Sequence, residues 1–209
     1  MLTESGSARV IDKAIGVENG AGMKSGVRII GGKWRGRKLG VVDIDGLRPT
    51  PDRIRETLFN WLAADCRGAA VLDCFAGSGA LGLEALSRGA RSLVALERSP
   101  AALDSLRGFA ARLDSSAIEI RGGDAIAAIA DLDGEFDLVF IDPPYAEAGL
   151  RRRVFERLET AGRLRPGARI YFEWPAGEEF ELPSANLAWL KRKTAGQVNY
   201  AIAEWRPSG

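Results

Sequence analysis

The chain has 209 residues, of which 46% are hydrophobic and 27% are charged, and its formal net charge is +1. This composition supports a packed core in one domain of ordinary size and excludes wholesale disorder. The sequence contains no histidine and only two cysteines, Cys66 and Cys74, which excludes an imidazole base, a Ser-His-Asp triad and His-ligated or Cys-rich metal sites, so we expect no metal.

Residues 1–26 are rich in Gly, Ser and Ala and lack hydrophobic periodicity, and we expect a flexible tail there. The tail has no apolar signal-peptide core, and no apolar run in the chain reaches the roughly 20 residues that a membrane span requires. Free thiols fit a reducing compartment. We therefore expect a cytoplasmic protein without a membrane partner.

Residues 27–66 are predicted to form a basic N-terminal extension. Residues 27–30 and 33–39 should form two short strands around a glycine turn. A helix should follow, with Thr50 as its N-cap and Pro51 at its first position. The helix carries an apolar stripe at helical spacing, which predicts core packing.

The extension concentrates positive charge. Between Arg28 and Arg55 the sequence has eight basic and three acidic residues, a difference of +5 in 28 residues. Such a segment can pair with a phosphate backbone and release its counterions, although a solvated basic face has the same pattern. The residues that we expect to contact a nucleic acid are Lys33, Trp34, Arg35, Arg37, Lys38, Arg48, Thr50, Arg53 and Arg55.

From residue 67 the pattern alternates between strands and helices. Buried strands are predicted at residues 70–75, 92–97, 118–120, 136–142 and 168–173, with helices between them. This repetition predicts an α/β fold with a doubly wound, mostly parallel sheet. Residues 187–193 and 198–205 should then add a terminal antiparallel hairpin, giving seven strands in all.

A glycine-rich loop follows the first of these strands. Gly77, Gly79 and Gly82 satisfy G-x-G-x-x-G, which allows close approach of a ligand to the backbone at the start of a helix. Glu97 ends the next strand, where a carboxylate can accept both ribose hydroxyls. The loop therefore predicts a nucleotide-containing ligand.

Two ligands fit this loop, a dinucleotide and S-adenosylmethionine. Asp73 at the entrance of the loop would repel a pyrophosphate but could pair with the ammonium group of S-adenosylmethionine. Asp124 could accept a hydrogen bond from the adenine amine, could cap a helix, or could do both. We favour S-adenosylmethionine, and the residues that we expect to bind it are Asp73, Ala76, Gly77, Ser78, Gly79, Glu97, Asp124 and Ala125.

The fourth strand runs directly into Asp142, Pro143, Pro144 and Tyr145. Two consecutive prolines stiffen this loop, which offers a carboxylate, a carbonyl and an aromatic ring at the carboxyl end of a strand. The carboxylate and the Pro143 carbonyl can accept both hydrogens of an exocyclic amine, while the tyrosine ring stacks on its base. We therefore predict that these four residues are catalytic.

Taken together, the motifs resemble the RsmD type of bacterial 16S rRNA guanine-N2 methyltransferases. The resemblance covers residues 28–206 and depends on residues 28–39, 47–60, 73–88, 142–145 and 195–198. It implies a Class I methyltransferase (Rossmann-like) fold over residues 67–209 and S-adenosylmethionine as the cofactor. It further implies transfer to the N2 amine of one guanine in 16S rRNA, within the small subunit or an assembly intermediate, by a protein that we expect to be a monomer.

Alternative functions remain open from the residues alone. The Asp-Pro-Pro-Tyr loop also suits adenine N6 or a protein glutamine amide, and the glycine loop with Glu97 also suits a nicotinamide oxidoreductase. A non-catalytic RNA-binding module is a third possibility. Arg53 and Arg55 could contact RNA phosphate, or one of them could contact the methionine carboxylate.

Overall fold

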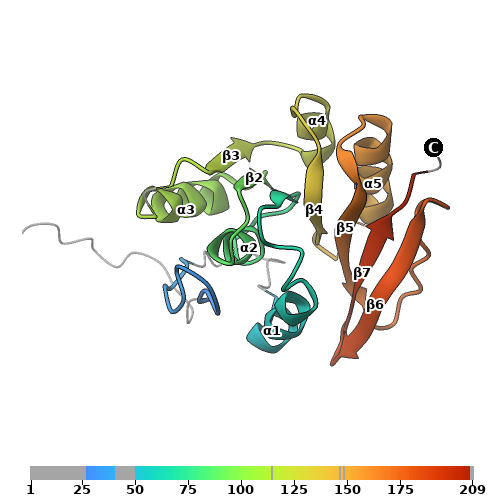
Figure 1. The fold of residues 1–209 in the computed structure, drawn as a ribbon, viewed down its shortest axis with the longest axis horizontal. Helices are drawn as coiled ribbons and strands as arrows, with labels where there is room; N and C mark the ends of the chain where they lie inside the picture. Colours follow the sequence, from blue (N-terminus) through green and yellow to red (C-terminus); the bar gives the residue numbers. More distant parts are fainter. Residues whose placement is uncertain (1–26, 41–49, 114, 146, 148, 208–209) are drawn as a thin grey trace, which may run out of the picture.

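The structure is a computed structural model, which describes residues 27–40, 50–113, 115–145, 147 and 149–207 (Figure 1). The expected flexible tail at residues 1–26 and the expected RNA contact Arg48 lie outside these residues. The helices are α1 (Asp52–Trp61), α2 (Gly82–Ser87), α3 (Pro100–Ala111), α4 (Ala125–Ala130) and α5 (Leu150–Thr160). The strands are β1 (Ala70–Asp73), β2 (Ser92–Glu97), β3 (Ile118–Gly122), β4 (Phe136–Ile141), β5 (Leu164–Pro175), β6 (Leu187–Ala195) and β7 (Val198–Trp205).

The strands form a single sheet in the order β3-β2-β1-β4-β5-β7-β6. Strands β1 to β5 pair in parallel, whereas β7 is antiparallel to both β5 and β6. The predicted α/β sheet of seven strands with a terminal antiparallel hairpin is confirmed. Because β1 lies between β2 and β4, the loops that follow these three strands meet at one edge of the sheet.

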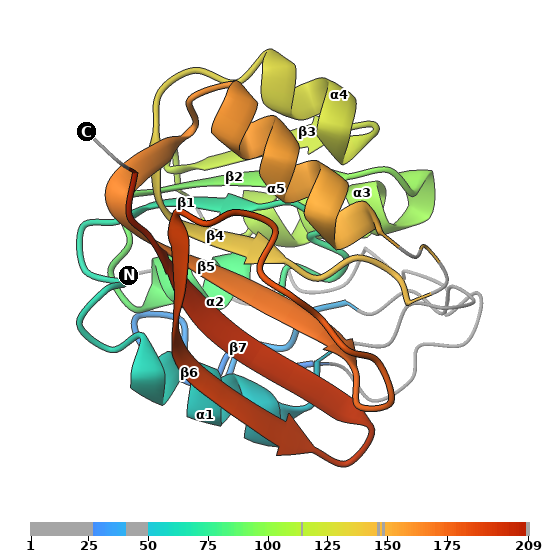
Figure 2. The same cartoon turned by 90° about the vertical axis from the view of Figure 1, so that its right-hand side faces the viewer.

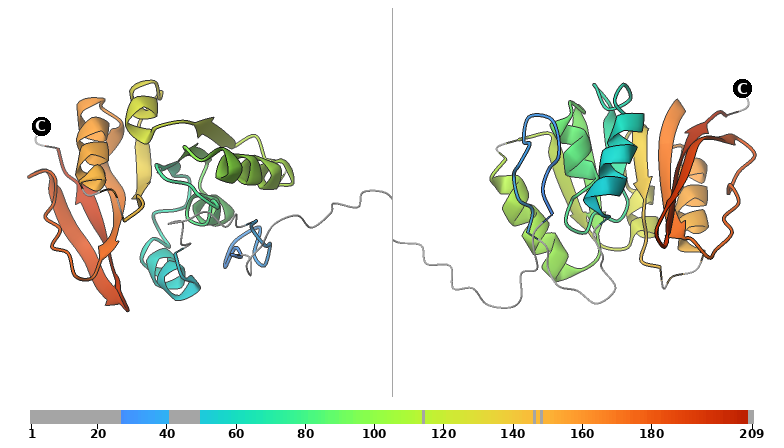
Figure 3. Two further views of the ribbon diagram at one scale, coloured as in Figure 1. Left: turned by 180° about the vertical axis from the view of Figure 1, so that it is seen from behind. Right: turned by 90° about the horizontal axis from the view of Figure 1, so that it is seen from below.

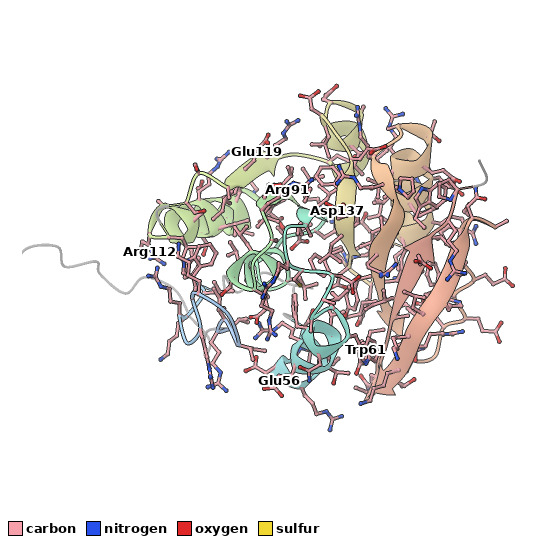
Figure 4. The ribbon with its side chains drawn as sticks, in the orientation of Figure 1. Glu56, Trp61, Arg91, Arg112, Glu119 and Asp137 are labelled. Carbon is pink, nitrogen blue, oxygen red and sulfur yellow. The ribbon has the colours of Figure 1, made fainter. Side chains whose placement is uncertain are left out.

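Helices cover both faces of the sheet. Figure 2 shows α4 and α5 on one face and α1 and α2 on the other. The side chains of α1, α2 and α3 share one buried cluster with the segment of residues 27–40, and those of α4 and α5 share the second. Trp61 at the end of α1 stacks on Tyr200 of β7, with ring centroids 5.4 Å apart (Figure 4). The N-terminal extension therefore packs into the same core as the sheet.

The expected hairpin at residues 27–39 is only partly formed. A single antiparallel bridge joins Arg28 to Lys38, and residues 31–36 form bends and turns instead of strands. Figure 3 shows the segment beside α2 and α3. Three backbone hydrogen bonds join the two arms, from the N–H groups of Ile29, Gly36 and Leu39 to the carbonyls of Arg37, Ile29 and Val27, so the predicted pairing is present but short. The second predicted strand starts later than expected, because residues 31–36 form bends and turns that helix α2 holds.

Helix α2 holds the segment through two buried side chains. The carboxylate of Glu84 accepts from the backbone N–H groups of Ile30 and Gly31 at 2.7 and 2.8 Å. The hydroxyl of Ser87 accepts from the N–H of Trp34 at 2.9 Å and donates to the carbonyl of Gly31 at 2.6 Å. The segment is thus attached to the helix that follows the glycine loop.

One predicted helix start differs from the structure. The first helix has Pro51 at its N-cap and no side-chain cap, so the predicted capping role of Thr50 was wrong. Helix α2 begins at Gly82, after turns at residues 77–81. Within the described part of the chain, no helix is long and apolar enough to cross a membrane.

Candidate functional site

Four acidic side chains lie at the carboxyl ends of neighbouring strands. Asp73 ends β1, Glu97 ends β2, Asp142 follows β4, and Glu173 lies near the end of β5. Strand β4 pairs with β1 on one side and with β5 on the other, which brings the loop after β4 between the ends of both strands. The sequence had predicted the first three of these acids as site residues.

Asp73 is only 2% exposed and holds the glycine loop against the sheet. Its carboxylate accepts from the N–H of Gly82 at 3.0 Å and from that of Phe75 at 3.4 Å. Burial raises the pKa of Asp73 to about 7, and these two backbone donors oppose the rise. A cationic group arriving next to this carboxylate would favour its ionised form.

The glycines of the loop are needed for the path of the chain as well as for access. Gly77 and Gly79 have φ angles of 52° and 80°, where residues with a side chain are strained. A Cβ atom at Gly82 would lie 2.7 Å from a methyl group of Leu93 and 3.1 Å from an Asp73 carboxylate oxygen. Ala76 and Ser78 of the same loop are buried. The loop is therefore packed tightly between Asp73 and β2.

Glu97 is 7% exposed and binds the same loop from the other side. One carboxylate oxygen accepts from the N–H of Gly77 at 2.8 Å, and the other accepts from the N–H of Ser99 at 2.7 Å. Each oxygen retains a second lone pair. The carboxylate can therefore keep both backbone contacts and still accept a ligand hydroxyl.

Asp124 is the N-cap of α4, since its side chain accepts from the N–H of Ala127 at 3.0 Å. This finding supports the capping role considered from the sequence. Asp124 is exposed and Ala125 is buried. A contact of either residue with a cofactor stays a prediction.

The loop from Asp142 to Tyr145 follows β4 as predicted. Tyr145 is 42% exposed as a residue, although its hydroxyl donates to Glu173 at 2.8 Å. The hydroxyl of Thr50 lies 3.3 Å from the Asp142 carboxylate. The tyrosine thus has a fixed end and an accessible ring, next to a carboxylate that a second side chain orients.

Glu173 is a site residue that the sequence analysis did not identify. It is 5% exposed and accepts from the hydroxyls of Tyr145 and Tyr171, both at 2.8 Å, with the hydroxyl of Thr50 3.5 Å away. The only sequence signal was an acidic residue at the end of a strongly apolar strand, which is unusual for a buried position. Thr50 was predicted to contact RNA, but it is buried between these two acids.

Ionisation is costly for both Asp142 and Glu173. Burial raises the pKa of Asp142 well above its usual value, and the negative charge of Glu173 raises it further. Burial also raises the pKa of Glu173, against which the hydroxyls of Tyr171, Tyr145 and Thr50 act. Two neighbouring acids, each with a raised pKa, are typical of a functional site.

Arg151 is a second residue whose position the sequence did not reveal. It is 6% exposed and pairs with Glu178 at 2.8 Å. Its positive charge opposes the rise in the pKa of Asp142 and of Tyr145. Arg151 therefore lowers the electrostatic cost of ionising Asp142.

The predicted RNA contacts fall into two groups. Lys33, Arg35, Arg37, Lys38 and Arg53 are exposed, and their contact with RNA stays a prediction. Trp34 is 4% exposed, and Arg55 is completely buried. Direct contact of these two side chains with RNA was a wrong prediction, because both are used in packing the extension onto the sheet.

The guanidinium of Arg55 is engaged by groups of the protein itself. Its guanidinium donates to the carboxylate of Asp52 at 2.6 Å and to the carbonyl of Arg28 at 2.9 Å. It also lies 3.9 Å from the carboxylate of Glu84. The side chain therefore links α1, α2 and the N-terminal segment.

Comparisons with known proteins agree with this geometry. The family described as "Conserved hypothetical protein 95" matches residues 27–204. A curated relative from Escherichia coli, named ribosomal RNA small subunit methyltransferase D, is 43% identical over 183 residues, covering 88% of this chain and 92% of the relative. The relative of the same name from Haemophilus influenzae is 39% identical, covering 86% of this chain and 94% of the relative.

Solved structures give the same result. A putative methyltransferase from Escherichia coli superposes with a TM-score of 0.80 at 43% identity, covering 87% of this chain and 99% of that structure. A putative methylase from Haemophilus influenzae has a TM-score of 0.74 at 35% identity, covering 88% and 100%. The chain therefore belongs to this family and is a methyltransferase of the RsmD type with a Class I, Rossmann-like fold.

Proposed function

We propose that the protein transfers a methyl group from S-adenosylmethionine to the exocyclic N2 amine of a specific guanine in 16S rRNA. The observation that carries this proposal is the position of the Asp142–Tyr145 loop. It follows β4, which is hydrogen-bonded to β1, so that the charge of Asp73 acts on Asp142. A planar base held at this loop would lie next to the ligand held at the glycine loop.

The residues at the ends of β1 and β2 fit S-adenosylmethionine by their chemistry. This cofactor supplies a methyl group bonded to a positively charged sulfur. The buried Asp73 carboxylate would accept from the ammonium group, and Glu97 would accept from the ribose hydroxyls with its free lone pairs. Asp124, the cap of α4, would accept from the adenine amine. Ala76, Gly77, Ser78 and Gly79 would contact the amino acid end.

The loop after β4 supplies the groups that the target amine needs. An exocyclic amine is a poor nucleophile because its lone pair is delocalised into the ring. Asp142 and the carbonyl of Pro143 would accept its two hydrogens and direct the lone pair toward the methyl group, so that alignment provides much of the rate gain. The Asp142 carboxylate would also stabilise the positive charge that develops on the nitrogen.

Tyr145 would bind the base itself. Its exposed ring offers a stacking surface, and stacking of a base on an aromatic side chain is worth about 1–3 kcal/mol. The exposed cations of the N-terminal segment, Lys33, Arg35, Arg37 and Lys38, would bind the phosphates around the target. The names of the relatives support the small ribosomal subunit as the source of the RNA.

Nucleoside analysis tests the proposal most directly. The protein is incubated with labelled S-adenosylmethionine and with small subunits, assembly intermediates or naked 16S rRNA, and the RNA is digested and examined by mass spectrometry. We expect label in N2-methylguanosine. Label in N6-methyladenosine would replace guanine by adenine as the target, and absence of label from every RNA would refute the proposed function.

A thermal shift assay tests the cofactor separately. Stabilisation by S-adenosylhomocysteine is expected, because a ligand that binds the folded state raises its stability. Stabilisation by NADH alone would instead favour a nicotinamide oxidoreductase. The thermal shift assay requires no RNA, so the proposed cofactor and the proposed RNA target are tested independently.

A further inference from the structure

The buried carboxylate of Glu173 collects hydroxyl groups from three separate segments. Tyr145 comes from the loop after β4, Tyr171 from β5 itself, and Thr50 from the residues before α1. Ionising a buried carboxylate is costly unless hydrogen bonds compensate for the lost water. An apolar residue would fill the same space without this cost, so the acid must contribute something other than packing.

The contact with Tyr145 determines where the tyrosine ring can lie. The Tyr145 hydroxyl donates a hydrogen bond to Glu173 at 2.8 Å, while the residue as a whole is 42% exposed. Without that bond the side chain could turn about its two side-chain torsions. Glu173 therefore limits the orientations of the only part of Tyr145 that a base could stack on.

The contact with Thr50 connects Glu173 to Asp142. The Thr50 hydroxyl lies 3.3 Å from the Asp142 carboxylate and 3.5 Å from the Glu173 carboxylate. A hydroxyl has a single hydrogen to donate, so this group is shared between the two acids. Its position next to Asp142 consequently depends on Glu173.

We propose that Glu173 is a positioning residue for methyl transfer, which holds the Tyr145 ring for the target base and, through Thr50, orients the Asp142 carboxylate. This inference rests on the proposed function. Loss of each hydroxyl should have a different effect. The Tyr145 hydroxyl affects binding of the base, whereas the Thr50 hydroxyl affects the orientation of Asp142, which acts on the amine. The third hydroxyl, on Tyr171, points to neither and provides a matched control.

Four single variants separate these contributions in steady-state methylation of small subunits. Tyr145→Phe keeps the ring but loses its anchor, so KM for the RNA substrate should rise about 3-fold with little change in kcat. Thr50→Val should lower kcat about 3-fold with little change in KM. Glu173→Gln should change both constants by about 10-fold. Tyr171→Phe removes a hydroxyl that supports the Glu173 carboxylate without contacting Asp142, and it should change each constant by less than Tyr145→Phe or Thr50→Val does.

A double variant tests whether Glu173 acts through the tyrosine. Adding Tyr145→Phe to Glu173→Gln should raise KM no further, since the anchor is already lost. The melting temperature and the affinity for S-adenosylhomocysteine are measured for every variant. Tyr145→Phe alters a partly exposed side chain and should fold normally, which keeps the test valid even if Glu173→Gln is poorly folded.

Two results would overturn the inference. The first is a Glu173→Gln protein with unchanged kcat and KM. The second is a Tyr171→Phe protein with the same kinetic loss as Tyr145→Phe, which would mean that the hydroxyls only stabilise the fold. Failure of the proposed function would be visible separately, as a wild-type protein that leaves the rRNA unlabelled.

Discussion

Two pairs of acids occupy the same edge of the sheet, and they differ in the groups that hold them. Asp73 and Glu97 accept from backbone N–H groups of the glycine loop and its neighbours. Asp142 and Glu173 lie against side-chain hydroxyls. Backbone donors are fixed by the path of the chain, whereas a hydroxyl can rotate toward a new partner. The first pair therefore suits a ligand of constant shape, and the second pair suits a substrate that must enter, react and leave.

Removal of the Asp142 carboxylate should have the largest effect on activity among the changes that separate the two pairs. Asp142→Ala is expected to lower kcat by about 10²–10³-fold, the usual loss when a group that stabilises developing charge is removed. The affinity for S-adenosylhomocysteine, measured by calorimetry, should change less than 2-fold. Normal turnover of the variant would remove Asp142 from the chemistry, and loss of cofactor affinity would abolish the distinction between the pairs.

Glu97→Gln tests the other pair of acids, which is proposed to bind the cofactor. Loss of a hydrogen bond from a charged group costs about 1.5–3 kcal/mol, so the Kd for S-adenosylhomocysteine should rise by about 10–100-fold. RNA affinity should stay within 2-fold, as measured by filter binding. The matched control is Glu56→Gln, at an exposed position on α1 (Figure 4). An equal loss of RNA affinity in Glu97→Gln would show that the two halves of the site cannot be separated.

The cations of the N-terminal segment sharpen the comparison, because α2 attaches them to the cofactor half. Neutralising four of them should weaken RNA binding about 10-fold and reduce the slope of log K against log salt by about 3. The control removes four exposed cations elsewhere. The test variant changes Lys33, Arg35, Arg37 and Lys38 to Gln, and the control changes Arg152, Arg153, Lys191 and Lys193. Equal slopes in the two variants would mean that only total charge matters.

The smallest expected effect is a pH dependence of stability at Asp73. Because its pKa is raised to about 7, the protonated acid favours the folded state below its ordinary pKa of 3.8, and this contribution is lost as the pH rises toward 7. Asp73→Asn does not undergo this loss. The melting temperature of the variant should therefore increase relative to wild type between pH 4 and pH 7, by a few degrees, and the difference should level off above pH 7.

Ligand addition provides the control for that measurement. In the proposed complex, the ammonium group of S-adenosylhomocysteine would lie next to Asp73, which would favour the ionised acid and should flatten the pH dependence of the wild-type protein. A difference between variant and wild type that does not vary with pH would contradict the role of burial. A dependence that the ligand leaves unchanged would contradict the contact with the ammonium group.

Of the four acids, Asp73, Glu97 and Asp142 were predicted from the sequence, whereas Glu173 was not. Asp73 and Glu97 belong to a continuous strand–loop–helix–strand unit, whose spacing alone indicates their positions. Glu173 meets Thr50 across 123 positions of the chain and Tyr145 across 28. A contact of that kind depends on the sheet order and on the attachment of the N-terminal extension, neither of which leaves a local pattern. The buried Arg55 shows the same limit, since its position in a basic run suggested a surface role.

The six-residue helix α2 connects two requirements of the reaction. It begins at the glycine loop, and its buried Glu84 and Ser87 hold the basic segment. At 1.5 Å per residue, the helix spans about 9 Å. In the proposed complex, α2 would therefore set the distance between RNA bound at the basic segment and the methyl donor bound at the glycine loop. An inserted residue would lengthen α2 by about 1.5 Å and rotate its far end by about 100°. Tolerance to insertions should therefore be lowest in this short helix.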